Sequence, residues 1–342
     1  MPDLGDGEWI NTPRPLSRDN LRGKVVLVDF WDYTCVNCIR TLPYLKAWHE
    51  RYEEKGLIVV GVHAPEFKFG RHGKQVQSAV QEFGIPYPVL LDNNYHAWDR
   101  FANRAWPTKH LVDADGYIRY VRQGEGRYRD TERAIQALLR QRDPAVSLPA
   151  LMPPLRDEDA AGAICPRPTP ELYAGYAGGG FYGGALGNPE GYVTAGPMAY
   201  VLPGPFDLRV GHFYLSGFWR AEPEAMIFVG QDKGRVVLRY RAARVNAVLS
   251  PTNDPVELLL DIRPGPATPL VEVRQDDAPL SETNAGRDVS FDETGVALAP
   301  ITRPRMVELV RNPGFEEHEL ELVFHAHGLA LYAFTFTSCV VH

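Results

Sequence analysis

Two cysteines, Cys35 and Cys38, have the spacing of a redox-active dithiol. They follow the apolar run VVLVDFW and open a stretch of helical periodicity, so Cys35 is expected at the N-terminus of a helix. Unpaired N–H groups and a partial positive charge at that position stabilise a thiolate. We therefore predict that Cys35 is the attacking thiol and that Cys38, one turn further along the helix, resolves the mixed disulfide.

A zinc site is the competing interpretation of this spacing, and it requires a second pair of ligands. The other two cysteines, Cys165 and Cys339, stand far apart and neither has a neighbouring cysteine. Thiol chemistry is therefore favoured, and we expect neither a metal nor a cofactor.

The elements that would position the dithiol alternate short β-branched runs with helical patterns. Strands are expected at 25–31, 57–62, 88–92, 108–113 and 117–122, and helices at 36–55, 74–83, 95–102 and 131–141. DADG at 113–116 is interpreted as the tight turn between the last two strands. This pattern predicts a compact α/β redox domain over residues 1–143 that contains a parallel βαβ unit.

The second half of the chain has a different pattern. Residues 144–171 are rich in proline and lack periodicity, as expected of an extended linker. Residues 172–342 consist of short alternating runs without long helices, which predicts an all-β jelly roll or β-sandwich. Strands are expected at 213–219, 225–230, 235–242, 245–250, 256–262, 306–311, 318–326 and 329–337. The glycine-rich stretch 175–191 lacks the ending of a phosphate-binding loop and is interpreted as irregular.

Length and composition limit the class of protein and its partners. A chain of 342 residues with 44% hydrophobic and 23% charged residues is expected to form two globular domains. The net charge of -7 disfavours nucleic acid as a partner. The first residues lack the basic and apolar regions of an export signal, which predicts a cytoplasmic location if Met1 is the native start.

The residues around the dithiol resemble the thioredoxin superfamily. In the segment VDFWDYTCVNC, Asp29 stands six residues before the first cysteine and is followed by the aromatic pair Phe30–Trp31. Pro43 stands five residues after the second cysteine. The resemblance implies that Asp29 is a buried carboxylate that exchanges protons with the thiol of Cys38, and that burial raises its pKa.

Other positions are candidates for substrate binding. Trp106, Pro107 and Thr108 resemble the cis-proline loop that faces the dithiol in this superfamily, and Trp31 is assigned to the same surface. His63 and Glu66 follow the strand at 57–62, at the sheet edge where α/β sites gather, and we expect them to line the groove beside the dithiol. The alternative for His63 and Glu66 is a capped loop that leads into the next helix.

The resemblance narrows to TlpA-like proteins. FWDYTCVNCIRTLPYL, GVHAPEF and residues 103–128, followed by the β domain, are similar to the extracytoplasmic part of DipZ-type thiol-disulfide oxidoreductases. In those proteins a TlpA-like domain precedes a jelly roll that resembles a carbohydrate-binding module. This implies an extracytoplasmic location, protein thiols and disulfides as substrates, a redox donor or acceptor such as a CcdA-like membrane protein, and carbohydrate at the β domain. The sequence departs from some TlpA-like proteins at Thr41, where they carry glutamate.

We therefore predict a thiol-disulfide oxidoreductase that exchanges disulfides with protein substrates. One alternative is a carbohydrate- or protein-binding module whose thioredoxin-like half is incidental. In that interpretation four strand aromatics would form a sugar platform rather than core, namely Tyr214, Phe218, Trp219 and Tyr240. The other alternative is a thioredoxin-fold peroxidase, although the proline of the peroxidatic motif is absent.

Cys165 and Cys339 lie near the two ends of the β domain. The first and last strands of a sandwich often lie side by side, so this pair is a candidate structural disulfide. The alternative is two buried free thiols. A disulfide would favour an oxidising compartment, and free thiols would favour the cytoplasm.

Overall fold

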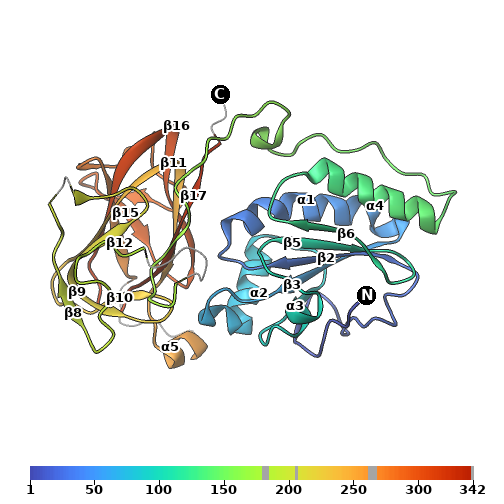
Figure 1. Ribbon diagram of the computed structural model, residues 1–342, viewed down its shortest axis with the longest axis horizontal. Coiled ribbons are helices and arrows are strands. Elements are labelled where there is room, and N and C mark those ends of the chain that lie inside the picture. Colours follow the sequence, from blue (N-terminus) through green and yellow to red (C-terminus); the bar gives the residue numbers. More distant parts are fainter. Residues whose placement is uncertain (179–184, 205–206, 261–267, 340–342) are drawn as a thin grey trace. The chain divides into compact units, whose positions relative to one another are not determined.

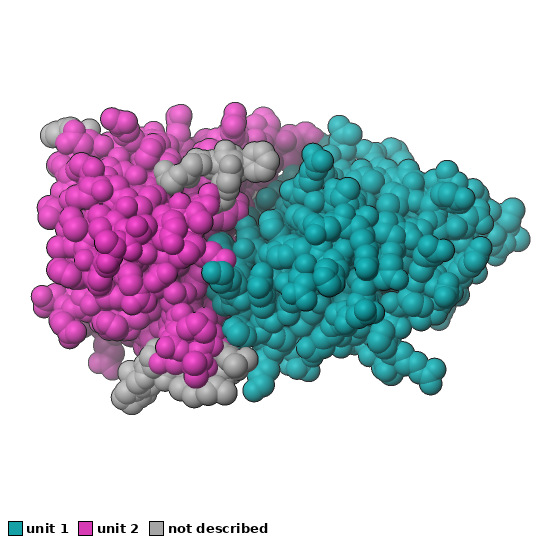
Figure 2. Space-filling view, turned by 60° about the horizontal axis from the view of Figure 1, so that its bottom comes forward, with its two compact units in different colours: residues 1–161 teal, residues 162–342 magenta. Residues whose placement is uncertain are grey.

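The computed structural model describes residues 1–178, 185–204, 207–260 and 268–339 (Figure 1). The chain divides into two compact units, Met1–Ala161 and Gly162–His342 (Figure 2). Within the described ranges, none of the helices combines the length and the apolar character needed to cross a membrane.

Unit 1 is built on a mixed sheet with the strand order β1-β4-β3-β2-β5-β6. Its strands are β1 (Trp9–Ile10), β2 (Val25–Trp31), β3 (Leu57–His63), β4 (Val89–Leu91), β5 (Thr108–Val112) and β6 (Ile118–Gln123). β2 pairs in parallel with β3, and β3 with β4, so the predicted βαβ unit is confirmed. Every residue of β2 is buried, as expected of a central strand that is covered on both faces.

Four α-helices cover this sheet: α1 (Val36–Tyr52), α2 (Gly73–Glu82), α3 (His96–Arg100) and α4 (Tyr128–Arg142). α1 and α4 lie on one face, and α2 and α3 lie on the other (Figure 1). α1 ends earlier than predicted, because the 3-10 turn Glu53–Lys55 and Gly56, with φ of 99°, lead the chain into β3. Two further 3-10 turns occupy Lys68–Arg71 and Asp157–Asp159.

The proline-rich segment from residue 144 to residue 161 belongs to unit 1. It packs along the helical face through hydrogen bonds of its backbone. Gln136 of α4 donates to the carbonyl of Pro149 over 2.8 Å, and Tyr44 of α1 accepts from the backbone N–H of Leu155 over 2.8 Å. This part of the chain is therefore fixed to the domain that carries the dithiol.

Unit 2 consists mainly of antiparallel strands. They are β7 (Leu172–Tyr173), β8 (Met198–Tyr200), β9 (Phe213–Ala221), β10 (Met226–Phe228), β11 (Gly234–Ser250), β12 (Leu270–Gln275), β13 (Ala278–Pro279), β14 (Ser290–Phe291), β15 (Ala297–Pro300), β16 (Arg305–Phe324) and β17 (Ala330–Thr337). β9 pairs with β10 and β11, and β17 also pairs with both of them. These four strands therefore close into a ring, which protects their edges from pairing with other chains.

Two pairs of predicted strands are joined into single long strands. β11 includes both 235–242 and 245–250, and β16 includes 306–311 and most of 318–326. The two long strands pair with each other, with a register shift between Ala242 and Arg244. A β-bulge at this point lets β11 bend while its hydrogen bonds to β16 continue, so the polar residue Arg244 does not end the strand.

The predicted strand at 256–262 is wrong where the structure describes it. Pro255–Leu260 forms the short helix α5, and residues 261–262 lie outside the described residues, as do residues 179–184 of the glycine-rich stretch. The Asp254 carboxylate accepts hydrogen bonds from the N–H groups of Val256 and Glu257 over 2.7 and 3.2 Å. This cap and the proline at the first helical position together start a helix here, although the run that follows resembles a strand.

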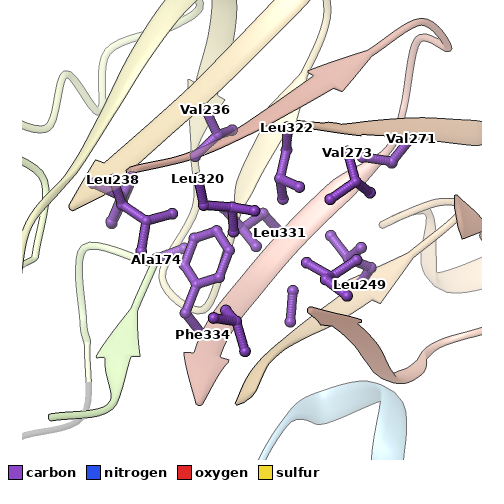
Figure 3. Packing of buried hydrophobic residues seen from close by; sticks show 14 of the residues in the cluster. Ala174, Val236, Leu238, Leu249, Val271, Val273, Leu320, Leu322, Leu331 and Phe334 are labelled. Carbon is purple, nitrogen blue, oxygen red and sulfur yellow. The ribbon is translucent and has the colours of Figure 1, made fainter. Parts of the chain in front are cut away.

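The core of unit 2 is apolar and comes from most of its strands (Figure 3). It includes Val236, Leu238, Leu320, Leu322, Val271, Val273 and Leu331. Three of the four candidate sugar-binding aromatics, Tyr214, Trp219 and Tyr240, are buried, and only Phe218 among the four is exposed, at 48%. These residues therefore form no common aromatic platform.

Candidate active site

The dithiol lies where β2 passes into α1. Cys35 is the N-cap of α1, and its Sγ accepts a hydrogen bond from the N–H of Cys38 over 3.2 Å. The two cysteines form a disulfide with a Cα–Cα distance of 5.2 Å. Cys35 is 8% exposed and Cys38 is 1% exposed, so a second molecule reaches Cys35 first. The helix N-terminus would stabilise the thiolate of Cys35 after reduction.

Asp29 lies in β2, the strand that precedes the dithiol, and it is buried. Its side chain is 2% exposed, and its Oδ1 has no hydrogen-bond partner among the described residues. Burial raises the pKa of Asp29 to about 7, against the opposing effect of the positive charge of Lys109. A carboxyl group with such a pKa accepts and returns a proton near neutral pH.

Lys109 is a site residue that sequence reasoning missed. It pairs in register with Asp29 across β2 and β5, and it is completely buried. Its Nζ donates to the carbonyl of Gly124 over 3.2 Å. Burial lowers the pKa of Lys109, and the charge of Asp29 opposes this shift. A lysine inside the strand expected at 108–113 was a signal for a buried cation, which needs a polar partner.

Trp31 and Thr108 are not on the surface that the sequence assigned to them. Trp31 is 1% exposed and Thr108 is fully buried, so neither is available to a substrate in this structure. The indole of Trp31 packs over Gly61, where a Cβ atom would lie only 3.0 Å from Nε1. Because the neighbouring strand has a glycine at this position, the tryptophan lies within the core.

The Trp106–Pro107 peptide bond is cis. Trp106 is half-buried and donates from Nε1 to the carbonyl of Ala64 over 2.9 Å. Thr108, the residue after Pro107, pairs in register with Phe30, so this loop lies at the edge of the sheet from which Cys35 emerges. Pro107 is buried, whereas Trp106 is partly exposed, so Trp106 remains the candidate for side-chain contact with a substrate and Pro107 shapes the loop that presents it.

His63 and Glu66 have different surroundings from those predicted. His63 is completely buried, and its Nε2 lies 3.3 Å from Oδ2 of Asp32, so it does not line an open groove. Glu66 is half-buried, and its backbone N–H donates to the same Asp32 oxygen over 3.1 Å. Asp32 was not singled out in the sequence, although it precedes Cys35 by only three residues.

An ion-pair cluster links α1 to the segment after α4. Arg40 of α1 pairs with Glu125 at 2.9 Å, and Arg156 lies 3.6 Å from the same carboxylate. Arg156 also pairs with Asp159 at 2.6 Å. Glu125 lies directly after Gly124, whose carbonyl accepts from Lys109, so the cluster adjoins the loop that binds this buried lysine.

A second disulfide lies in unit 2. Cys165 and Cys339 are joined, with their Cα atoms 4.3 Å apart. They are 174 residues apart in the sequence, and the strands β7 to β17 lie between them. Among the residues that the structure describes, no group of three or more histidine, cysteine, aspartate or glutamate side chains is arranged to hold a metal ion.

Both units match known families. Residues 2–139 match the family described as Redoxin, and residues 169–337 match the family described as Thioredoxin like C-terminal domain. The DipZ proteins of Mycobacterium bovis and Mycobacterium tuberculosis are 37% identical over 256 residues, which is 73% of this chain and 35% of each relative. The chain thus spans about a third of the length of these relatives.

Smaller relatives resemble the first unit. The thiol-disulfide oxidoreductase YkuV of Bacillus subtilis is 26% identical over 141 residues, or 41% of this chain and 93% of YkuV. The solved structure of a thiol-disulfide isomerase from Corynebacterium glutamicum is 26% identical, covers 41% of this chain and 94% of its own, and has a TM-score of 0.35.

These matches confirm the predicted order of a thioredoxin-like α/β domain and a strand-rich β domain. The chain is a homologue of DipZ in which a Redoxin domain, of the thioredoxin-like class, is followed by a thioredoxin-like C-terminal domain.

Proposed function

We propose that this protein is a thiol-disulfide oxidoreductase that acts on protein substrates through Cys35 and Cys38. The observation that carries the proposal is the unequal burial of the two cysteines: Cys35, at the start of a helix, is 8% exposed, and Cys38 is 1% exposed. This is the arrangement that two-step disulfide exchange requires. Relatives named as thiol-disulfide oxidoreductases support it.

In the reducing direction the Cys35 thiolate attacks one sulfur of a substrate disulfide. A mixed disulfide forms, and the other substrate sulfur leaves as a thiolate. Asp29 then takes the proton of the Cys38 thiol, and the Cys38 thiolate attacks the Cys35 sulfur. The second substrate sulfur leaves, so the substrate gains two electrons and the protein ends with its Cys35–Cys38 disulfide.

The remaining site residues have supporting roles in this proposal. Trp106, which is half-buried, contacts the substrate chain beside Cys35, the buried Pro107 fixes the loop that presents it, and Glu66, which is also half-buried, lies at the border of that surface. The resemblance to DipZ-type proteins adds two proposals about partners. They are a CcdA-like membrane protein as redox partner and carbohydrate as a ligand of the β domain.

Insulin reduction tests the proposal. Wild-type protein with dithiothreitol should precipitate the insulin B chain well before dithiothreitol alone, and Cys35→Ser should remove this acceleration. Cys38→Ser should instead accumulate a mixed disulfide with the substrate, because the resolving step is lost. Wild-type protein that is no faster than the uncatalysed reaction, while its dithiol is verified to be reduced, would refute the proposal. Consumption of hydrogen peroxide in a parallel assay would indicate the peroxidase alternative.

A further inference from the structure

A buried pair formed by a carboxylate and an imidazole lies next to the dithiol and has no role in the exchange steps above. Asp32 is 1% exposed and His63 is completely buried, with 3.3 Å between Oδ2 and Nε2. The ring of His63 stacks on Tyr33 at 5.5 Å between ring centroids and meets the edge of Trp31 at 5.4 Å. Placing an ionisable pair in such surroundings is costly unless both partners are held in place.

Asp32 also shapes the turn that carries Cys35. Its Oδ1 accepts hydrogen bonds from the N–H and the hydroxyl of Thr34, and its backbone carbonyl accepts from the N–H of Cys35 over 3.3 Å. Its Oδ2 accepts from the N–H of Glu66, in the loop after β3. One carboxylate therefore ties the turn before α1 to the neighbouring strand and its loop.

The carboxylate of Asp32 is held in its ionised form. Burial alone would raise its pKa, but the neighbouring imidazole of His63, together with the hydrogen bonds of Thr34, lowers the pKa below its usual value. The pair thus has its carboxylate on the residue that builds the Cys35 turn. Its imidazole is one strand away, on β3.

We propose that Asp32 and His63 act together as a positioning unit that fixes the Cys35 turn and sets the redox potential of the dithiol. This inference rests on the proposed function and adds the two residues that set the redox potential of its dithiol. A lone carboxylate beside Cys35 would destabilise the thiolate and favour the disulfide, and the imidazole of His63 beside that carboxylate offsets the effect. Removing either partner should therefore change the potential, in opposite directions.

Other charges face the same region and must stay constant in the test. They are Asp29 on β2, Lys109 on β5 and Glu66 in the loop after β3, and none of them is substituted. The dithiol of the full chain is equilibrated with glutathione redox buffers at fixed pH, and the reduced fraction is measured by thiol labelling. Alkylation of Cys35 against pH provides a second readout.

The expected shifts have opposite signs. His63→Gln leaves the Asp32 charge unpaired, so the equilibrium should move towards the disulfide by about tenfold, or about 30 mV more reducing. Asp32→Asn keeps an oxygen for Thr34 but removes the charge, so the equilibrium should move several-fold towards the dithiol. The alkylation profile should move to higher pH in His63→Gln and to lower pH in Asp32→Asn. The double variant should lie between the two single variants.

The control is His49→Gln, which breaks another histidine–carboxylate pair of similar length, 3.4 Å, near the far end of α1. It should leave the equilibrium unchanged. Shifts of the same sign in both single variants, or no shift in either, would overturn the proposal, because a merely loosened turn affects both alike. If His63→Gln does not fold, the direction in which Asp32→Asn alone shifts the redox equilibrium decides the test. Wild-type insulin reduction in the same preparations separates failure of this inference from failure of the proposed function.

Discussion

Asp29 and Lys109, which are opposite each other on β2 and β5, are both buried, and they differ from the pair of Asp32 and His63. The pKa of Asp32 is lowered, whereas burial raises the pKa of Asp29 to about 7. Asp29 is therefore suited to exchange a proton near neutral pH, and Asp32 is suited to hold a fixed charge. Two aspartates three positions apart have different roles because their partners differ.

Asp29→Asn should remove the pH dependence of exchange near neutrality. In wild-type protein the insulin-reduction rate should rise through pH 7 as Asp29 ionises, and the variant should lose that rise and be slower above pH 7. The assay is run across pH 5.5–8.5 with equal amounts of folded protein. A variant whose profile matches the wild type would exclude Asp29 as the proton acceptor.

The same substitution should stabilise the fold at high pH. Since the pKa of Asp29 is raised from 3.8 to about 7 in the folded protein, its contribution to stability is present below pH 3.8 and is lost as pH rises through 7. Asp29→Asn lacks this loss and should have a free energy of unfolding about 2–4 kcal/mol higher than wild type at pH 8. The difference should vanish near pH 4. Urea denaturation at both pH values measures it, and equal stability at pH 8 would contradict the assignment.

Lys109→Met should move the exchange profile to higher pH. The positive charge of Lys109 lowers the pKa of Asp29, so its removal raises that pKa further and leaves less carboxylate at pH 7. Exchange at pH 7 should then slow several-fold and recover at higher pH. Lys46→Met on α1 is the matched control and should leave the profile unchanged. A loss of rate that is equal at all pH values would indicate a structural role for Lys109 instead.

At the scale of elements, Tyr44 of α1 connects the proline-rich segment to the helical face. Its hydroxyl donates to the Asp159 carboxylate over 2.8 Å and accepts from the N–H of Leu155 over 2.8 Å. Its ring stacks on Tyr128 of α4, with 3.6 Å between centroids. One side chain thus connects two helices with the segment that follows them.

Tyr44→Phe should loosen this segment while keeping the ring stack. Both hydrogen bonds of the hydroxyl are lost, which should cost about 1–2 kcal/mol of local stability. Cleavage between residues 150 and 161 in limited proteolysis should therefore become faster. Tyr117→Phe is the control, because Tyr117 is 62% exposed and its substitution should leave cleavage unchanged. Protection equal to that of wild type would show that other contacts hold the segment.

At the scale of the whole molecule, the two units have different means of stabilisation. The first is held by its apolar sheet and helices, and the second adds the Cys165–Cys339 disulfide around its strands. Structural disulfides of this kind persist in oxidising compartments. This supports an extracytoplasmic location as a proposal.

Replacing both Cys165 and Cys339 with serine should destabilise the β domain. The closed loop spans 174 residues, and the chain-entropy model gives a loss of at most about 5 kcal/mol for a loop of that size. Calorimetry should show a lower transition temperature for the β domain and an unchanged insulin-reduction rate. Peptide mapping under non-reducing conditions checks the linkage. Free thiols at both positions in protein never exposed to reductant would contradict it.

Local sequence patterns were sufficient to predict the main strands and helices. The buried run of β2, the helical spacing after Cys35 and the turn between β5 and β6 all lie within short windows, and the structure confirms them. The dithiol and its helix could be predicted for the same reason. Where a local signal was weighed wrongly, as at Asp254 and Pro255, a helix was taken for a strand.

Only the tertiary structure decided which charges meet. The register between β2 and β5 places Lys109 opposite Asp29, and the register between β2 and β3 places His63 opposite Trp31, where its ring reaches Asp32. A shift of one residue turns a side chain to the other face of a sheet, and no short window of sequence fixes that register. The sequence by itself therefore determined the dithiol and the order of domains, and strand pairing determined the buried ions that surround the dithiol.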